Sequence, residues 1–194
     1  MIETLKNIDT QLLLFFNHLN IPLLDFIFYW ISEKWIWVPF YVFLAWLVIR
    51  KYKQNSIWIF IFVAAAIAAS DQIASGLIKE NVKRLRPCHE PSIMNEIHIV
   101  MGYCGGPYGF ISSHATNTFT LAAFLIRLIP DSFRGFVSMM WIWAAVVSFS
   151  RIYLGVHYPG DVIVAIILGL LIGKIFANVC FKVMDKKSLI KSNV

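Results

Sequence analysis

The stretch of sequence that decides the fold is Ile57–Leu77, which reads IWIFIFVAAAIAASDQIASGL. Its one charged residue is Asp71. A helix needs about 20 predominantly apolar residues to cross the hydrocarbon core of a bilayer. The stretch therefore predicts a transmembrane helix, and the next question is which other segments cross the membrane beside it.

The composition of the whole chain agrees with a membrane protein. Of the 194 residues, 59% are hydrophobic and 14% are charged, and the mean hydropathy is +0.69. Soluble domains have about 45–50% apolar and about 25% charged residues. A soluble single domain and a disordered chain are therefore both excluded.

The apolar stretches predict an all-α integral membrane protein, a bundle of five transmembrane helices. The N-terminal stretch is also apolar, but several polar residues that hydrocarbon would not accommodate interrupt it between Asn17 and Asp25. We expect an interfacial amphipathic helix there, then a short second helix after Pro22, with a sixth span as the alternative. The five predicted spans are Trp35–Ile49, Ile57–Leu77, Ala115–Leu128, Phe136–Phe149 and Val162–Phe181.

Residues 1–194 are expected to form one membrane domain. Within it, residues 1–32 hold the interfacial or re-entrant N-terminal helices, residues 35–182 the helical bundle, and residues 183–194 a cytoplasmic tail.

The distribution of Lys and Arg predicts the orientation, because cytoplasmic loops carry an excess of both. Three segments that fall on one side of the predicted bundle are basic, so this side should be cytoplasmic. The net charge of +6 then reports topology and implies no nucleic-acid partner. The basic residues of these segments are Arg50, Lys51, Lys53, Arg127, Arg134, Lys182, Lys186, Lys187 and Lys191.

The links 80–114 and 151–160 fall on the opposite side, and they too carry cations. Lys83, Arg84, Arg86 and Arg151 lie there, against the usual bias. An anionic ligand on that face would compensate for these charges.

The first chemically informative segment is Lys79 followed seven residues later by Arg86 and then Pro87. If the helix continues, Lys79, Lys83 and Arg86 share one stripe, with Lys79 and Arg86 about 10 Å apart. Pro87 breaks the run and disfavours helix at Arg86. A paired Lys and Arg suit an oxyanion, although a basic helix end touching lipid headgroups is the alternative.

The second segment is Ser112-Ser113-His114, just before the third predicted span. Serines cap helices, and the free N–H groups of a helix start bind anions. A histidine there could transfer a proton. Taken alone, the segment is better explained as a plain cap with a bystander histidine.

The third segment reads SRIYLGVHYPGD over Ser150–Asp161. Arg151 ends the fourth predicted span, His157 lies in the link, and Asp161 lies in the first turn of the fifth. Asp161 could accept a hydrogen bond from one ring nitrogen of His157, which would leave the other nitrogen free as a nucleophile. Asp161 as a helix cap alone is the alternative.

Together, the three segments resemble the signature of the type 2 phosphatidic acid phosphatase superfamily, the membrane lipid phosphate phosphatases. That signature is K-x6-R-P, then P-S-G-H, then S-R-x5-H-x3-D. The second part departs from the pattern, because Ile111 replaces the proline and Ser113 replaces the glycine, while Ser112 and His114 are retained. The first and third parts are matched in full by Lys79, Arg86 and Pro87 and by Ser150, Arg151, His157 and Asp161.

The resemblance implies a phosphomonoesterase that uses no metal or other cofactor. His157 would attack phosphorus and form a phosphohistidine, Asp161 would orient His157, and His114 would protonate the leaving oxygen and then activate water. The groups implied to hold the phosphoryl oxygens belong to Lys79, Arg86, Ser112, Ser113 and Arg151.

Two pairs of residues near this signature are also of interest. Asp71 and Ser75 fall on one helix face with Lys79, and we expect this face to point into the bundle and to link Asp71 to the site. Cys88 and Cys104 both lie in link 80–114 and could form a disulfide if that side is a periplasm, with free thiols as the alternative.

The short chain further resembles the undecaprenyl diphosphate phosphatases of this family, so undecaprenyl diphosphate is the first choice of substrate. Lipid A, phosphatidylglycerolphosphate and phosphatidic acid are alternatives, and the oligomeric state stays open. We expect the protein in a bacterial cytoplasmic (inner) membrane, with the site facing the periplasm.

Two rival interpretations remain. A vanadate-dependent haloperoxidase shares the pocket signature, but those enzymes are soluble. A non-enzymatic membrane protein whose basic loops bind anionic lipid headgroups would keep its function in the variant His157→Ala.

Overall fold

The computed structural model describes residues 2–186 of the chain. This part contains helices and loops, with one isolated bridge between Leu85 and Tyr108 in place of a sheet. The predicted tail 183–194 therefore lies partly outside the described residues. The helices are α1 (Ile2–Asn17), α2 (Pro22–Ser32), η1 (Lys34–Trp37), α3 (Val38–Tyr52), η2 (Lys53–Asn55), α4 (Ser56–Asp71), η3 (Gln72–Lys79), α5 (Glu80–Val82), η4 (Pro87–His89), η5 (Val100–Gly102), α6 (Ser113–Leu128), α7 (Phe136–Tyr153) and α8 (Pro159–Lys186).

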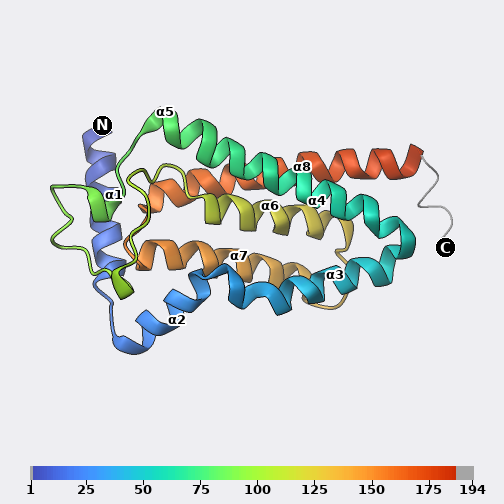
Figure 1. Cartoon of the computed structure of the whole chain (residues 1–194), viewed down its shortest axis with the longest axis horizontal. Coiled ribbons are helices and arrows are strands. Elements are labelled where there is room, and N and C mark those ends of the chain that lie inside the picture. The colour runs from blue at the N-terminus through green and yellow to red at the C-terminus, as the bar shows by residue number, and fades with distance from the viewer. Residues whose placement is uncertain (1, 187–194) are drawn as a thin grey trace.

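The long helices α3, α4, α6, α7 and α8 run along one axis, and α1 stands across one end of them (Figure 1). We name this the α1 end, and the end that holds η2 the far end. The loop after α5 and the starts of α6 and α8 all lie at the α1 end. Segments distant in sequence are thereby brought to one place.

Helices α6 and α8 meet at two glycines of α8. A Cβ atom added at Gly169 would lie 2.6 Å from the carbonyl oxygen of Thr116, and one at Gly173 would lie 2.5 Å from that of Thr120. Only a residue without a side chain allows two helix backbones to approach this closely. The close packing holds the N-terminus of α6 beside that of α8.

Three helical segments of the described residues are long and apolar enough to cross a membrane: Lys34–Val82, Phe136–Tyr153 and Pro159–Asp185. The first folds back on itself, because α3 and α4 run in opposite directions on either side of η2 (Figure 1). The helical membrane architecture is therefore confirmed. Helix α6 has only 16 residues, so the number of five spans stays a prediction.

The N-terminal residues form two helices, as the break at Pro22 predicts. Helices α1 and α2 meet at an angle of 114°, and as one broken span they would add a fourth candidate. The polar residues at the break hold it in place. The buried Asn17 side chain donates to the carbonyls of His98 and Tyr153 at 2.9 and 2.8 Å and accepts from the His98 N–H at 2.7 Å.

The prediction that Lys79, Lys83 and Arg86 share a helical stripe is wrong. Residues Gln72–Lys79 form a π-helix, and the helix ends at Val82, after which Lys83 takes a left-handed backbone conformation with φ of 51°. Arg86 lies in the following loop, where its N–H donates to the carbonyl of Pro107 at 2.8 Å. Pro87 excludes helical backbone at Arg86, and the pairing with the loop at Pro107 replaces the helix.

Candidate active site

His157 lies in the tight link between α7 and α8 and is 1% exposed. Its N–H donates to the carbonyl of Arg151 at 3.2 Å, so the end of α7 fixes the position of the histidine backbone. Asp161 follows in the first turn of α8, where Oδ2 accepts from the N–H of Tyr158 at 3.1 Å. His157 Nδ1 lies 3.6 Å from Asp161 Oδ2. The two side chains face each other at a distance slightly beyond that of a hydrogen bond.

The neighbours of His157 determine which ring nitrogen carries the proton. Arg86 Nη1 lies 3.4 Å from His157 Nε2. A guanidinium can only donate, so Nε2 has the lone pair and the proton sits on Nδ1, which faces Asp161. Burial, and then the charges of Arg86, Arg151 and Lys79, hold the pKa of His157 well below 6.5. The site therefore presents a neutral imidazole whose Nε2 lone pair faces Arg86 Nη1.

The guanidinium of Arg86 is held by backbone carbonyls of the loops around it. Nε donates to Tyr108 at 3.2 Å and Nη1 donates to Val156 at 3.4 Å. Burial and the nearby charge of Arg151 lower the pKa of Arg86 below its usual value. A cation fixed beside another cation is placed to meet an anion from outside the protein.

Arg151 is the second buried cation of the site, with 2% of its surface exposed. Its Nη1 donates to the hydroxyl of Ser32, and its guanidinium lies 5.5 Å from the centre of the Tyr103 ring. Its Nε has no hydrogen-bond partner among the described residues. Within residues 2–186, no carboxylate lies within 4.0 Å of Arg86 or Arg151. Buried charges are normally paired, and these two arginines have no such partner among the described residues.

The hydroxyl of Ser113 connects the third cation to the site. Lys79 Nζ donates to Ser113 Oγ at 3.3 Å, and Ser75 Oγ lies 2.7 Å from the same oxygen. Ser75 in turn donates to Asp71 Oδ1 at 3.5 Å. The face of Asp71, Ser75 and Lys79 thus points into the bundle toward the start of α6. Ser112 caps α6, and its Oγ accepts from the N–H of Ala115 at 3.5 Å.

His114 lies one residue further along α6, at the wall of a cavity of about 530 Å³. The cavity is also lined by the polar residues Ser113, Asn117 and Asp71, and Trp37, Tyr41, Val63, Leu121 and Trp143 are among its apolar lining residues. The cavity therefore joins the imidazole of His114 to an apolar space between α3, α4, α6 and α7.

The structure places Cys88 and Cys104 in a disulfide. It joins η4 to the loop that follows η5, next to Arg86.

Sequence reasoning missed Asp9 altogether and gave Arg84 no part in the site. Arg84 Nη1 donates to Asp161 Oδ1 at 2.7 Å, and Nη2 donates to Asp9 Oδ2 at 2.8 Å. The excess of positive charge in link 80–114 pointed to Arg84. Nothing in the sequence pairs it with Asp9, because the two lie 75 positions apart.

The model of the PAP2 superfamily matches residues 60–185, which include every residue of the signature. A lipid A 4'-phosphatase of Porphyromonas gingivalis is 38% identical over 172 residues, which cover 88% of this chain and 72% of that protein. A lipid A 4'-phosphatase of Bacteroides thetaiotaomicron is 38% identical over 184 residues, which cover 94% and 81%.

The fold is also found among solved structures. The transmembrane PAP2 type phosphatidylglycerolphosphate phosphatase from Bacillus subtilis superimposes with a TM-score of 0.68 at 20% identity, covering 95% of this chain and 87% of the other. The resemblance stated from the sequence is confirmed. The chain belongs to the PAP2 superfamily and is a hydrolase of phosphate esters.

Proposed function

We propose that the chain removes a phosphate group from a lipid A-type glycolipid through a phosphohistidine at His157. The observation that carries the reaction is the pair of buried arginines, Arg86 and Arg151, for which residues 2–186 provide no carboxylate within 4.0 Å. Arg86 lies 3.4 Å from the unprotonated Nε2 of His157. A phosphate monoester would supply the anionic partner for these two arginines. His157 Nε2 supplies the nucleophile.

The first half of the reaction transfers the phosphoryl group to the enzyme. His157 Nε2 attacks phosphorus, the bond from phosphorus to the lipid oxygen breaks, and that oxygen takes a proton from His114. Asp161, which faces Nδ1, stabilises the positive charge that develops on the ring. In the second half, His114 takes a proton from water, the oxygen of that water attacks phosphorus, the bond from phosphorus to His157 Nε2 breaks, and inorganic phosphate leaves.

Fixed cations lower the barrier for both halves. Charge in the transition state spreads over the three equatorial oxygens of the phosphoryl group. Arg86, Arg151 and Lys79 are held in place before the substrate arrives, so they stabilise that charge without reorganising. Backbone N–H groups at the start of α6, at Ser112 and Ser113, are the proposed further donors.

The relatives favour lipid A over undecaprenyl diphosphate as the substrate. Both lipid A 4'-phosphatases share 38% identity with this chain over most of its length. The apolar cavity beside His114 suits the lipid part of any such substrate and does not discriminate between them. The first choice made from the sequence, undecaprenyl diphosphate, therefore becomes the competitor in the test.

We place the site at the outer, periplasmic face of the bacterial inner membrane. Exposed cations at the far end, including Arg50, Lys53 and Arg127, support this orientation. The disulfide at the α1 end supports it as well, because disulfides persist in oxidising compartments.

The test is phosphate release by the purified protein in detergent from lipid A, undecaprenyl diphosphate, phosphatidylglycerolphosphate and phosphatidic acid. We expect the highest kcat/KM with lipid A, no loss of rate in EDTA, and no release by the His157→Asn variant. Preference for another lipid would overturn the substrate assignment. Absence of release from all four lipids would overturn the function.

A further inference from the structure

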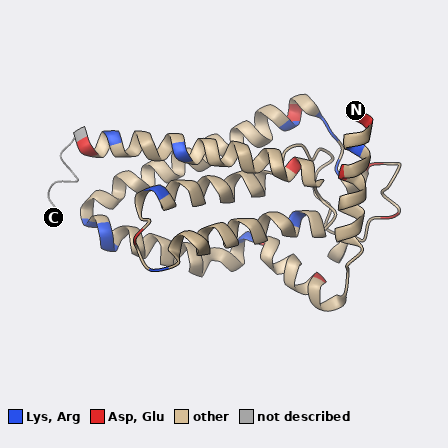
Figure 2. Cartoon of the chain, turned by 180° about the vertical axis from the view of Figure 1, so that it is seen from behind, with Lys and Arg blue, Asp and Glu red and all other residues tan. Residues whose placement is uncertain are grey.

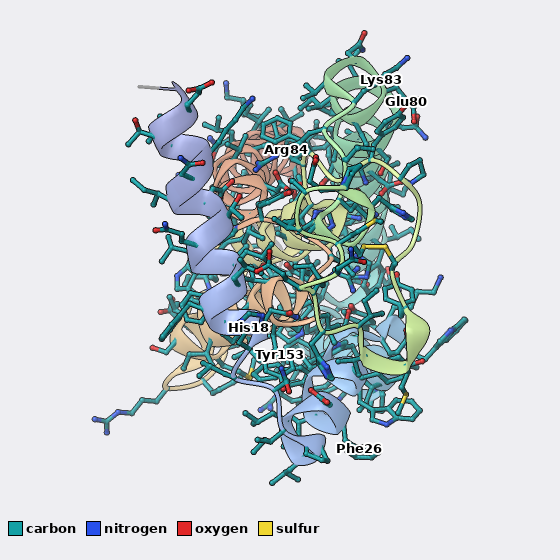
Figure 3. The ribbon with its side chains drawn as sticks, turned by 90° about the vertical axis from the view of Figure 1, so that its left-hand side faces the viewer. His18, Phe26, Glu80, Lys83, Arg84 and Tyr153 are labelled. Carbon is teal, nitrogen blue, oxygen red and sulfur yellow. A yellow bond between two sulfur atoms is a disulfide. The ribbon has the colours of Figure 1, made fainter. Side chains whose placement is uncertain are left out.

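Arg84 occupies a position that the phosphate-binding account does not explain. It lies between α1 and the rest of the α1 end, whereas its neighbour Lys83 and the nearby Glu80 lie at the outer tip of α5 (Figure 3). Its guanidinium spans two carboxylates, with Nη1 on Asp161 and Nη2 on Asp9 at 2.7 and 2.8 Å. The ring of Tyr158 lies 3.7 Å from the guanidinium carbon. Both arms of Arg84 are thus engaged by the protein, and neither is free for a substrate.

Asp161 depends on this contact, because its side chain is 0% exposed and a buried carboxylate needs a cationic partner. Within the described residues, Arg84 is the cation within 4.0 Å of Asp161, and the neutral imidazole of His157 lies 3.6 Å away. Arg84 holds Oδ1, and the N–H of Tyr158 holds Oδ2. These two contacts fix the plane of the carboxylate, which leaves Oδ2 facing His157 Nδ1.

Asp9 fixes the other arm of Arg84 and brings α1 into the arrangement. Its Oδ1 accepts from the N–H of Gly160 at 2.7 Å, so it also caps the start of α8. A Cβ atom at Gly160 would lie 2.9 Å from Asp9 Oδ2, so a larger residue there would displace the Asp9 carboxylate. The carboxylate of α1 and the first turn of α8 therefore lie in direct contact on either side of Arg84.

We propose that Asp9 and Arg84 are positioning residues of the catalytic apparatus, through which α1 orients Asp161 and thereby His157. This inference rests on the proposed phosphatase function. It assigns α1 a part in catalysis, in addition to covering the end of the bundle. It also explains why a cation on the non-cytoplasmic side contacts two carboxylates of the protein itself.

The test compares Arg84→Gln, Arg84→Lys and Asp9→Asn with the matched control Lys83→Gln, which removes an exposed cation from the adjacent position. The full-length variants are assayed in detergent with lipid A, for kcat and KM from pH 6 to 8.5. Thermal unfolding of each variant reports whether it is folded.

At pH 7 we expect Arg84→Gln to lower kcat about 30- to 100-fold, with KM changed less than about threefold, as for other groups that orient a catalytic residue. The loss should shrink as pH rises, because a carboxyl without its cation takes up a proton more readily. Asp161 is faced by Arg84, Arg86, His157 and Tyr158, and only the first is changed.

The remaining variants refine the result. The kcat of Arg84→Lys should be about 10-fold lower than that of the unmodified protein. An ammonium group cannot bind both carboxylates at once, as the planar guanidinium does. The kcat of Asp9→Asn should fall about 5-fold. The double variant Asp9→Asn/Arg84→Gln should have a kcat close to that of Arg84→Gln alone, because the two residues act through one contact. Lys83→Gln should stay within about twofold of the unmodified protein.

Three results would overturn the proposal. One is full activity in folded Arg84→Gln, a second is a loss that is equal at every pH, and a third is a rise in KM that accounts for the loss in kcat/KM. If the unmodified protein and Lys83→Gln also release no phosphate from any lipid, the proposed function itself is wrong.

Discussion

The two ends of the bundle carry the same kind of residue in opposite settings. At the far end, Arg50, Lys51 and Lys53 surround the turn between α3 and α4 and are exposed, and a group of Lys and Arg is visible there in Figure 2. At the α1 end, Arg86 and Arg151 are 9% and 2% exposed.

This difference separates cations that anchor the protein from cations that bind a ligand. An exposed Lys or Arg keeps its water and contributes little to stability. A buried one has lost its water and destabilises the fold unless an anion replaces it. Since the described residues provide no carboxylate for Arg86 and Arg151, we propose that the substrate supplies the anion.

The largest expected difference between the two ends is seen when one cation is removed from each. Arg151→Gln should lower kcat/KM for lipid A about 1,000-fold, because the transition state loses a buried charge. Arg127→Gln, at the far end, should change it less than about twofold. Steady-state kinetics on both variants measures the contrast, and similar losses in the two would contradict it.

A smaller effect is expected at Ser113, where this chain departs from the family pattern. Its hydroxyl holds Lys79 and Ser75, so Ser113→Gly should release the ammonium and raise KM about 10-fold with little change in kcat. Ser132→Gly, in the loop after α6, is the control. An unchanged KM would show that the Ser113 hydroxyl does not position the Lys79 ammonium for substrate binding.

The disulfide should matter for stability more than for turnover. The double variant Cys88→Ser/Cys104→Ser loses a cross-link between positions 16 apart, worth about 3 kcal/mol in the chain-entropy model. We expect a lower Tm, with kcat within about threefold of the unmodified protein at 20 °C. Cys180→Ser provides the comparison, and an equal Tm for both variants would show that the cross-link contributes nothing.

The smallest effect concerns pH. The pKa of His157 is lower in the folded protein than its unfolded value of 6.5, so the unfolded state takes up this proton first as pH falls. Stability should therefore decrease as pH drops below about 6.5. The pH dependence of thermal unfolding should be shallower in His157→Asn, and identical slopes would contradict the depressed pKa.

Much of the arrangement at the α1 end could be predicted, because its residues lie in short sequence segments with fixed spacing. The step from His157 to Asp161 crosses the start of a helix marked by Pro159, so their proximity follows from local rules. Lys79, Ser75 and Asp71 also face one way in the structure, toward Ser113.

The rest depends on contacts that no local pattern contains. A shared stripe of Lys79 and Arg86 required the helix to continue to Arg86, but the helix ends at Val82 and Arg86 pairs with the loop at Pro107. The contact of Arg84 with Asp9 exists only because α1 stands across the bundle. Charge counts pointed to a surplus of cations on this side, yet they could not tell a ligand-binding arginine from a positioning one.

A rapid-quench experiment with lipid A labelled in its phosphate tests directly whether His157 forms a phosphohistidine. We expect a burst of dephosphorylated lipid that precedes phosphate release. The label should be found on a peptide that contains His157, and this label should be stable in base and lost in acid. His157→Asn should show neither burst nor label. Label on another residue, or turnover by His157→Asn, would contradict the account.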